Sequence, residues 1–344
     1  MPSTLRIGVI GCGNIAYWTY FRELRRIRGC RLVAAADPSP AARNRASKLT
    51  GLCVESLSEV LLARGDVDAV VITAPSGLHA GLAVAAAEAG KHIYLEKPIA
   101  TSMPDAQRVV AAVESAGVRA AVGFNRRYHP AFEQCKKLLA SGRLGALRSV
   151  QMTFSEPAGL AGPSGWRDSR ALGGGVLLDF ASHHVDLLRW ILEEEPANVS
   201  AGVFDHRAEH DTAWIRLGYE GGMQALGYYS SAAGRADSMA FFCEKGSVMV
   251  DRFSPFVRIT MSRRLGYGIR RVAALPSWEC WAWQFQRLLR PSWEPSYRRA
   301  LTNFVGLCRG EKQHLATMGD GCEAVRIIVA AEQAALEGVV VVLR

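Results

Sequence analysis

Short, mostly apolar runs alternate with longer amphipathic stretches over the first 122 residues, and this alternation limits the fold more than any other feature. Runs of this kind are typical of parallel strands that are buried on both faces of a sheet. The amphipathic stretches between them have the length of crossover helices. We therefore expect a doubly wound α/β domain. The expected strands span residues 6–10, 31–36, 69–72, 92–95 and 119–122, and the expected helices span residues 14–28, 41–49, 79–89 and 104–115.

The pattern changes after about residue 123, where alternating apolar and polar residues predict an open, mainly antiparallel sheet. We therefore expect a first domain of residues 1–123 and an α+β domain of residues 124–344, with the final helices and strand free to pack back near the first domain. The last strand is expected in the second sheet. The elements expected here are strands 147–154, 199–204, 213–219, 223–229 and 339–343, and helices 176–192, 296–305 and 320–335.

The composition is that of a globular protein with a large core, since 49% of the 344 residues are hydrophobic. No apolar run approaches the roughly 18 residues that a membrane span needs, so no membrane partner is expected. The start runs straight into a glycine motif, which argues against a cleaved signal peptide. The eight cysteines form no C-x-x-C pair, which indicates reduced thiols in a cytoplasmic protein. Disordered, collagen-like, membrane-channel and disulfide-scaffold classes are excluded.

A glycine motif lies where the first strand turns into the first helix, at residues 11–16 (GCGNIA). Gly11 allows the tight turn, Gly13 lets the backbone approach a pyrophosphate, and the small Ala16 lets helix and strand pack closely. The following helix start offers free N–H groups to phosphates. This context predicts a Rossmann dinucleotide-binding domain, with Gly11, Gly13, Asn14, Ile15 and Asp37 expected at the cofactor.

Asp37 ends the second strand about 21 residues beyond Ala16, where the motif places a carboxylate for the adenosine ribose. A carboxylate there favours NAD, because it would repel the 2′-phosphate of NADP. Arg43 lies nearby and could weaken that preference, so NADP is kept as the alternative. The competing interpretation is an ordinary glycine turn, with Asp37 capping the next helix.

Lys97 follows the strand that ends at Leu95, in the sequence Glu96-Lys97-Pro98. Ligands of open α/β sheets bind at the carboxyl edge, so this lysine could reach a substrate hydroxyl beside a nicotinamide ring. The alternative is a surface Lys–Glu pair before a proline turn.

Asp179, His183 and Asp186 are spaced to share one face of the expected helix 176–192, which follows three glycines at 173–175. Two carboxylates and an imidazole on one face can order a proton relay. The glycines would let substrate or cofactor approach the backbone closely. His184 points about 100° away from His183, and we interpret it as a packed or solvated bystander.

These motifs together resemble the glucose–fructose oxidoreductase / inositol dehydrogenase / MocA-type dehydrogenases over nearly the whole chain. The resemblance implies that Lys97 acts on a substrate hydroxyl and that Asp179 and His183 meet it at the substrate, while Asp186 is structural. One departure is Ala181, where the family pattern usually has glycine. The segments that carry the resemblance are 11–16, 73–79, 96–100, 123–127 and 173–186, and it implies that Thr73, Pro75, His79 and Glu96 lie near NAD.

The expected reaction moves a hydride between nicotinamide and a secondary alcohol or ketone of a sugar, nucleotide sugar or cyclitol. Asn125, Arg127 and Arg167 are the candidate substrate contacts. Two alternatives stay open: a redox-neutral glycosidase that uses bound NAD, and a non-catalytic sugar-sensing regulator. Family resemblance also implies a homodimer or homotetramer that uses the exposed face of the second sheet.

Two further patterns are set aside. Residues 206–210 match the zinc-peptidase spacing H-x-x-E-H, but they lie between strand patterns and are expected in a hairpin loop, with no metal. Segment 252–299 holds ten arginines, two acids and four tryptophans. We interpret this segment as an amphipathic insertion that covers the sheet or forms a subunit contact; no nucleic-acid partner is expected. Its arginines could alternatively bind a nucleotide or the diphosphate of a nucleotide sugar.

Overall fold

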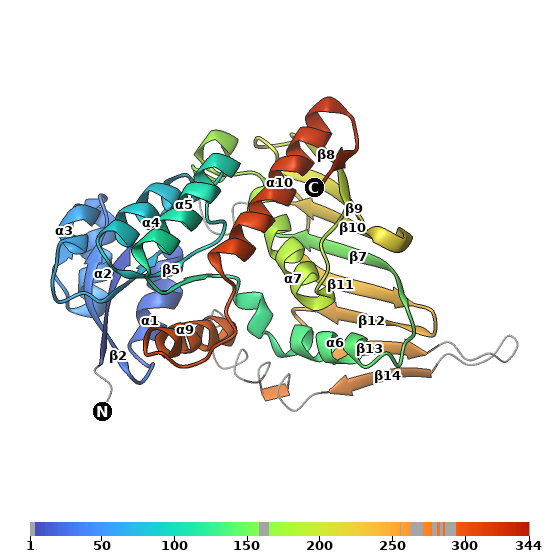
Figure 1. The fold of residues 1–344 in the computed structure, drawn as a ribbon, viewed down its shortest axis with the longest axis horizontal. Helices are drawn as coiled ribbons and strands as arrows, with labels where there is room; N and C mark the ends of the chain where they lie inside the picture. Colours follow the sequence, from blue (N-terminus) through green and yellow to red (C-terminus); the bar gives the residue numbers. More distant parts are fainter. Residues whose placement is uncertain are drawn as a thin grey trace, which may run out of the picture. The chain divides into compact units, whose positions relative to one another are not determined.

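The computed structural model describes residues 4–157, 165–254, 256–261, 271–276, 281–282, 285 and 294–343. The chain forms two compact units. The first contains residues 1–125 and 292–326, and the second contains residues 126–291 and 327–344. The chain therefore enters the first unit twice, and each unit is built from two separate stretches of sequence (Figure 1).

Six parallel strands form the sheet of the first unit, in the order β3-β2-β1-β4-β5-β6. This confirms the doubly wound α/β prediction, and every expected strand is found. Only β3, two residues long, has no counterpart among the predictions. The strands are β1 (Leu5–Ile10), β2 (Cys30–Ala36), β3 (Val54–Glu55), β4 (Ala69–Ile72), β5 (His92–Leu95) and β6 (Ala120–Val122).

Two of this unit's helices begin at serine caps: Ser39 accepts a hydrogen bond from the backbone of Ala42, and Ser102 from that of Asp105. The helix expected over residues 14–28 is shorter, because it ends at Leu24 and the chain turns through Gly29, at φ +85°, into β2. The helices are η1 (Ala16–Tyr20, a π-helix), α1 (Phe21–Leu24), α2 (Pro40–Thr50), α3 (Ser58–Leu62), η2 (Ser76–Leu78, 3₁₀), α4 (His79–Glu88), α5 (Met103–Ala116) and α9 (Pro295–Cys308).

The second unit contains a nine-stranded sheet in the order β14-β13-β12-β11-β7-β10-β9-β8-β15. Neighbouring strands are antiparallel except β7 and β10, so the prediction of a mainly antiparallel α+β domain is confirmed. The last strand returns to this sheet, as expected. The strands are β7 (Leu147–Ser155), β8 (Asn198–Phe204), β9 (Thr212–Gly218), β10 (Gln224–Ser230), β11 (Ala236–Cys243), β12 (Gly246–Asp251), β13 (Phe256–Met261), β14 (Arg271–Pro276) and β15 (Val341–Val342).

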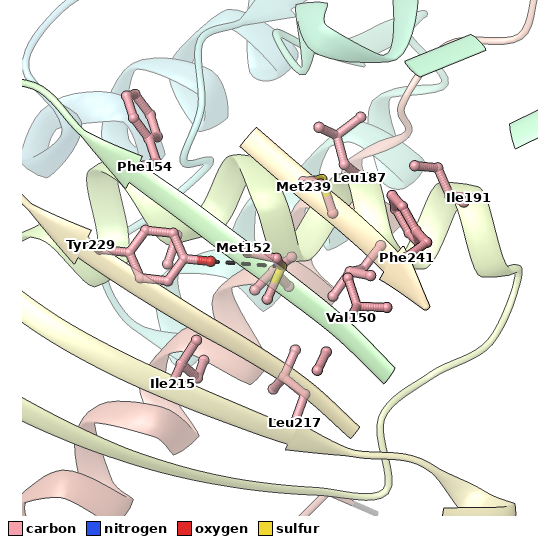
Figure 2. Close-up of a cluster of buried hydrophobic side chains, with 14 of the residues drawn as sticks. Val150, Met152, Phe154, Leu187, Ile191, Ile215, Leu217, Tyr229, Met239 and Phe241 are labelled. Atoms are coloured by element: carbon pink, nitrogen blue, oxygen red, sulfur yellow. Dashed lines mark hydrogen bonds between the residues drawn. The ribbon is translucent and has the colours of Figure 1, made fainter. Parts of the chain in front are cut away.

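Helices pack on one face of this sheet and bury its core. Figure 2 shows side chains of β7, β9, β10 and β11 in one buried cluster with Leu187 and Ile191 of helix α7 (Ser182–Leu192). Each large apolar side chain buried in this way contributes about 1.5–3 kcal/mol to folding. The helices that supply core residues are α6 (Pro130–Ala140), η5 (Leu177–Ala181, a π-helix), α7 (Ser182–Leu192) and the C-terminal part of α10 (Met318–Glu337).

The opposite face of the sheet exposes large apolar side chains on neighbouring strands. Trp214 on β9 lies directly across from Tyr228 on β10, and 41% and 45% of their surfaces are exposed. Other exposed residues of this outer face are Leu226, Phe242 and Met249. An apolar patch of this kind is typical of an interaction surface.

Two strands of the sheet edge, β13 and β14, come from the basic segment 252–299. Our interpretation of this segment as an insertion covering the sheet is therefore wrong for these residues, which extend the sheet sideways. The side chain of Arg252, at the start of this segment, is 16% exposed, and its guanidinium pairs with the buried Asp237. Residues 262–270, 277–280, 283–284 and 286–293 lie outside the described part of the chain. No helix in the described part is long and apolar enough to cross a membrane.

Candidate functional site

The carboxyl ends of the central strands of the first unit lie at one level. The sheet register pairs Ile10 with Ile72, and Ile72 with Leu95. The glycine loop, the loop that begins at Thr73 and the Glu96-Lys97-Pro98 turn therefore leave the sheet side by side. Ligands of open α/β sheets bind at this edge.

The glycine loop has the shape that a dinucleotide requires. Gly11 has a φ of +93°, and a Cβ atom there would lie 2.6 Å from the backbone nitrogen of Ala74. A Cβ at Gly13 would instead meet no atom within 4 Å. Gly11 thus permits the turn, while Gly13 leaves open space beside the helix start for a phosphate group. These residues fit a bound NAD.

Asp37 presents its carboxylate to the glycine loop. Its oxygens accept hydrogen bonds from the backbone nitrogens of Cys12, at 2.7 Å, and Ser39, at 2.8 Å. Ser39, not Asp37, is the N-cap of α2, which removes the alternative capping role. The Arg43 guanidinium donates to the carbonyl oxygens of Asp37 and Pro38, so it is held by backbone.

The loop after β4 is tied to both of its neighbours. The Thr73 hydroxyl donates to the carbonyl oxygen of Gly11 at 2.7 Å. His79, only 1% exposed, places Nδ1 2.6 Å from the Pro98 carbonyl oxygen and Nε2 2.8 Å from that of Ala74. Thr73 and His79 therefore lie at the predicted edge, and their contact with NAD stays a prediction.

Lys97 emerges from the end of β5 beside a buried carboxylate. Glu96 is 8% exposed and accepts hydrogen bonds from the Tyr20 hydroxyl and from the backbone nitrogen of Lys97, the latter at 3.0 Å. The Lys97–Pro98 peptide is cis. A surface Lys–Glu pair, the alternative interpretation, is thus wrong, because Glu96 faces inward. Burial, with the Glu96 charge second, raises the pKa of Tyr20, so its hydroxyl keeps the proton that it donates.

In the second unit, Asp179 and His183 lie on consecutive helical segments of different type. The expected single helix over residues 176–192 begins with a π-helical turn, η5, that contains Asp179. The α-helical spacing used to place Asp179 and His183 on one face therefore does not apply across this junction. π-helical turns are frequent at functional sites. His183 is nearly buried on α7, with its ring centre 6.3 Å from that of Phe154.

Three candidate substrate contacts are engaged with protein groups. Arg167 Nε donates to Asp179 at 3.0 Å, and Asn125 donates to the Ser296 hydroxyl at 2.7 Å. Arg127 makes a bidentate pair with Asp186, at 2.9 and 2.5 Å. Asp186 has the structural role that the resemblance implied, whereas substrate contact by Asn125, Arg127 and Arg167 stays a prediction.

A buried ionic cluster surrounds Asp237 on β11, and no sequence motif indicated it. Its carboxylate lies 2.9 Å from Arg126, 2.7 Å from Arg252 and 3.0 Å from His184 Nε2. Burial alone would raise the pKa of Asp237, but the two guanidinium groups and the His184 hydrogen bond lower it well below its ordinary value. His184 is fully buried, so of its two alternatives the packed one is correct. Nothing in the spacing of these residues indicated that β11 supplies their common partner.

Residues 206–210 lie in the loop of the β8–β9 hairpin, which confirms their placement. The Asp211 carboxylate accepts hydrogen bonds from the backbone N–H groups of residues 206, 207 and 208. The His210 carbonyl accepts a hydrogen bond from the backbone nitrogen of Val176, directly before the π-helical turn η5. The loop thus supports the start of the His183 helix. The described residues contain no group of three or more metal-ligating side chains.

Comparisons with known proteins agree with this geometry. A model described as an oxidoreductase family with an NAD-binding Rossmann fold matches residues 5–124. A second model, the GFO/IDH/MocA C-terminal domain, matches residues 132–249. The class of protein is thus an NAD-binding oxidoreductase with a Rossmann domain. More narrowly, the chain belongs to the GFO/IDH/MocA family, which confirms the resemblance drawn from its motifs.

Individual relatives include dehydrogenases and reductases. Inositol 2-dehydrogenase of Rhizobium meliloti (strain 1021) is 32% identical over 273 residues, which are 77% of this chain and 80% of that protein. The 1,5-anhydro-D-fructose reductase of Ensifer adhaerens is 32% identical over 64% of this chain and 65% of its own. Among solved structures, the WlbA dehydrogenase from Bordetella pertussis, in complex with NADH and UDP-GlcNAcA, is 25% identical with a TM-score of 0.84, over 99% of this chain and 98% of its own.

Proposed function

We propose that this protein is an NAD-dependent dehydrogenase that oxidises a secondary alcohol of a sugar, nucleotide sugar or cyclitol, or reduces the corresponding ketone. The observation that carries the proposal is the shared edge of the first sheet. There the glycine loop, Asp37 and Lys97 follow β1, β2 and β5, whose carboxyl ends lie at one level of the sheet. An ammonium-bearing side chain beside a dinucleotide site is suited to acid–base work on a hydroxyl group.

Bound NAD would supply the hydride acceptor, and the protein supplies orientation and proton handling. Gly11 and Gly13 admit the pyrophosphate, and Asp37 accepts hydrogen bonds from the adenosine ribose. Lys97 takes the hydroxyl proton during oxidation and returns it during reduction. His183 assists that proton transfer, and Asp179, held by Arg167, assists His183.

The class of substrate rests on the relatives. The similar proteins are named for an inositol, an anhydro sugar and, in a crystal complex, a UDP-linked sugar acid. These compounds share a ring that carries secondary hydroxyl groups. We therefore place the substrate of this chain in the same chemical class, with Asn125, Arg127 and Arg167 as the candidate contacts.

The test is a panel of cyclitols, free sugars and nucleotide sugars, assayed by NADH absorbance with NAD and NADP in parallel. We expect NAD-dependent NADH formation with at least one compound of the panel. Glycoside cleavage without NADH in solution would instead establish the redox-neutral alternative. Saturable binding of a sugar with no turnover in either direction would favour a regulator.

We also propose that the outer face of the second sheet joins copies of this chain into a homodimer or homotetramer. Trp214, Leu226 and Tyr228 offer a broad apolar surface there, with Arg216 and Gln224 as polar neighbours. A sheet face of this composition suits the same face of a second copy, because an isologous contact pairs each patch with itself.

A further inference from the structure

His79 is the residue through which two loops of the first unit are joined. Its imidazole is buried at the start of α4, where Nδ1 lies 2.6 Å from the Pro98 carbonyl and Nε2 lies 2.8 Å from the Ala74 carbonyl. Pro98 directly follows Lys97, and Ala74 directly follows Thr73. Both nitrogens of one rigid ring thus hold backbone atoms, one in the lysine turn and one in the loop after β4.

The His79 bridge belongs to a longer series of hydrogen bonds. The Thr73 hydroxyl fixes the loop after β4 to Gly11, in the glycine loop. On the other side of the lysine, the Glu96 carboxylate accepts the backbone N–H of Lys97. The backbone of Lys97 is therefore anchored before the residue by Glu96 and after it by His79. The series connects the expected position of the cofactor phosphates to the lysine.

The His79 ring lies between two carbonyl oxygens, both of which can only accept a hydrogen bond. Burial, the largest cause, lowers the pKa of His79; the two carbonyl groups oppose this effect, and the Lys97 charge adds to it. A neutral imidazole donates through one nitrogen only. In the neutral ring the tautomer therefore decides which carbonyl receives the hydrogen bond, and the other carbonyl is held by close contact with the ring.

We propose that His79 is a positioning residue that sets the place of Lys97 relative to the cofactor loop. The inference rests on the proposed function, since it assumes that Lys97 handles the substrate proton. It differs from the direct NAD contact implied by the family resemblance, because the ring nitrogens face protein backbone. Misplacement of a catalytic group by about 1 Å can cost about 100-fold in rate.

Two substitutions separate the two contacts. The amide nitrogen of asparagine lies as many bonds from Cα as Nδ1 of histidine, and that of glutamine as many as Nε2. His79→Asn therefore places an N–H group opposite the Pro98 carbonyl only, and His79→Gln places one opposite the Ala74 carbonyl only. We expect His79→Asn to keep kcat within about 3-fold, while its NADH binding weakens about 3- to 10-fold. We expect His79→Gln to bind NADH normally, while its kcat falls about 10- to 100-fold.

The assay measures the NADH dissociation constant by fluorescence, and it measures kcat per molecule of bound NADH. Partial unfolding lowers the number of binding sites, but it changes neither the dissociation constant nor this kcat. His92→Asn is the matched control. His92 accepts a hydrogen bond from the Arg119 backbone at the opposite end of β5, and its replacement by asparagine is expected to leave both constants unchanged.

A merely structural histidine would give equal losses in both variants, or changes only in thermal stability, and either result would overturn the inference. Each variant also carries its own test, because His79→Asn must keep kcat and His79→Gln must keep NADH affinity. The Lys97→Ala variant separates this inference from the proposed function. If Lys97→Ala retains full turnover, the proposed function fails; if it is inactive while the His79 variants do not differ, only the inference fails.

Discussion

At the scale of single residues, two positions are central to the cofactor site that we propose. Gly11 has a backbone conformation and a close neighbour that no side chain could accommodate, while Asp37 points a carboxylate toward the glycine loop. Both positions could be read from the sequence, because turn, strand and carboxylate follow one another at fixed spacing. The inward orientation of Glu96 could not, because its partner Tyr20 lies 76 positions away in the chain.

The Asp37→Asn variant tests the role of this carboxylate in cofactor choice. Removing the charge weakens a hydrogen bond to the ribose and relieves repulsion of a 2′-phosphate. We expect the preference for NAD over NADP, measured as the ratio of kcat/KM values, to fall about 10- to 100-fold. An unchanged ratio would show that Asp37 only orders the loop through Cys12 and Ser39.

At the scale of elements, the first sheet was predictable because parallel strands buried on both faces appear as apolar runs. Helix type was harder: the π-helical turns at 16–20 and 177–181 leave no mark in the apolar pattern. The strands β13 and β14 were missed because basic and aromatic residues in 252–299 suggested a surface insertion; β11 and β12, just before that segment, were not predicted either. The Asp237 cluster was missed for a different reason, since tertiary pairing alone brings Arg126, Arg252 and His184 to one carboxylate.

The Asp237→Asn variant should be strongly destabilised. It leaves Arg126 and Arg252 buried without their counter-charge, and breaking a buried pair in this way costs about 3–5 kcal/mol. Urea unfolding at pH 7 measures the loss. The matched control is Asp66→Asn, which removes an exposed ion pair with Arg64 and is expected to change stability little. Equal stability of the two variants would contradict this account.

The acid dependence of stability follows from the same cluster. Because the folded pKa of Asp237 lies below the unfolded value of about 3.9, the unfolded state takes up the proton first as pH falls. The contribution of Asp237 to stability is therefore complete above pH ~4 and is lost progressively below it. Urea unfolding between pH 5 and pH 2 should show a steeper decline for the wild type than for Asp237→Asn. Parallel curves would contradict the pKa assignment.

At the scale of the whole molecule, the sequence predicted two kinds of sheet, but it left open whether the final helices pack back near the first domain. Residues 292–326 return to the first unit, and α10 begins there before its second half joins the core of the other. Such a return depends on long-range packing, which local periodicity does not encode. The apolar outer face of the second sheet is likewise a property of the assembled strands.

The double variant Trp214→Lys/Tyr228→Lys tests that outer face. Lysines at these directly paired positions of β9 and β10 would face the same lysines in a second copy, and the like charges would repel each other. We expect the wild type to sediment as a multiple of the 37.4 kDa chain and the variant as a monomer. Leu57→Lys, at an exposed leucine of the first unit, is the control and should keep the wild-type mass. A monomeric wild type would end the proposal of a sheet-to-sheet assembly.

The most direct test of the whole account is turnover of the Lys97→Ala variant with the substrate found in the panel, alongside NADH binding. Lys91→Ala is the control, because the Lys91 ammonium holds the carbonyl groups of Arg64 and Val67 near the start of β5, opposite the site. We expect Lys97→Ala to bind NADH normally while kcat falls about 100- to 10,000-fold, the range typical of losing a general acid–base group. Lys91→Ala should turn over like the wild type. Wild-type turnover by Lys97→Ala would contradict the central claim that this lysine handles the substrate proton.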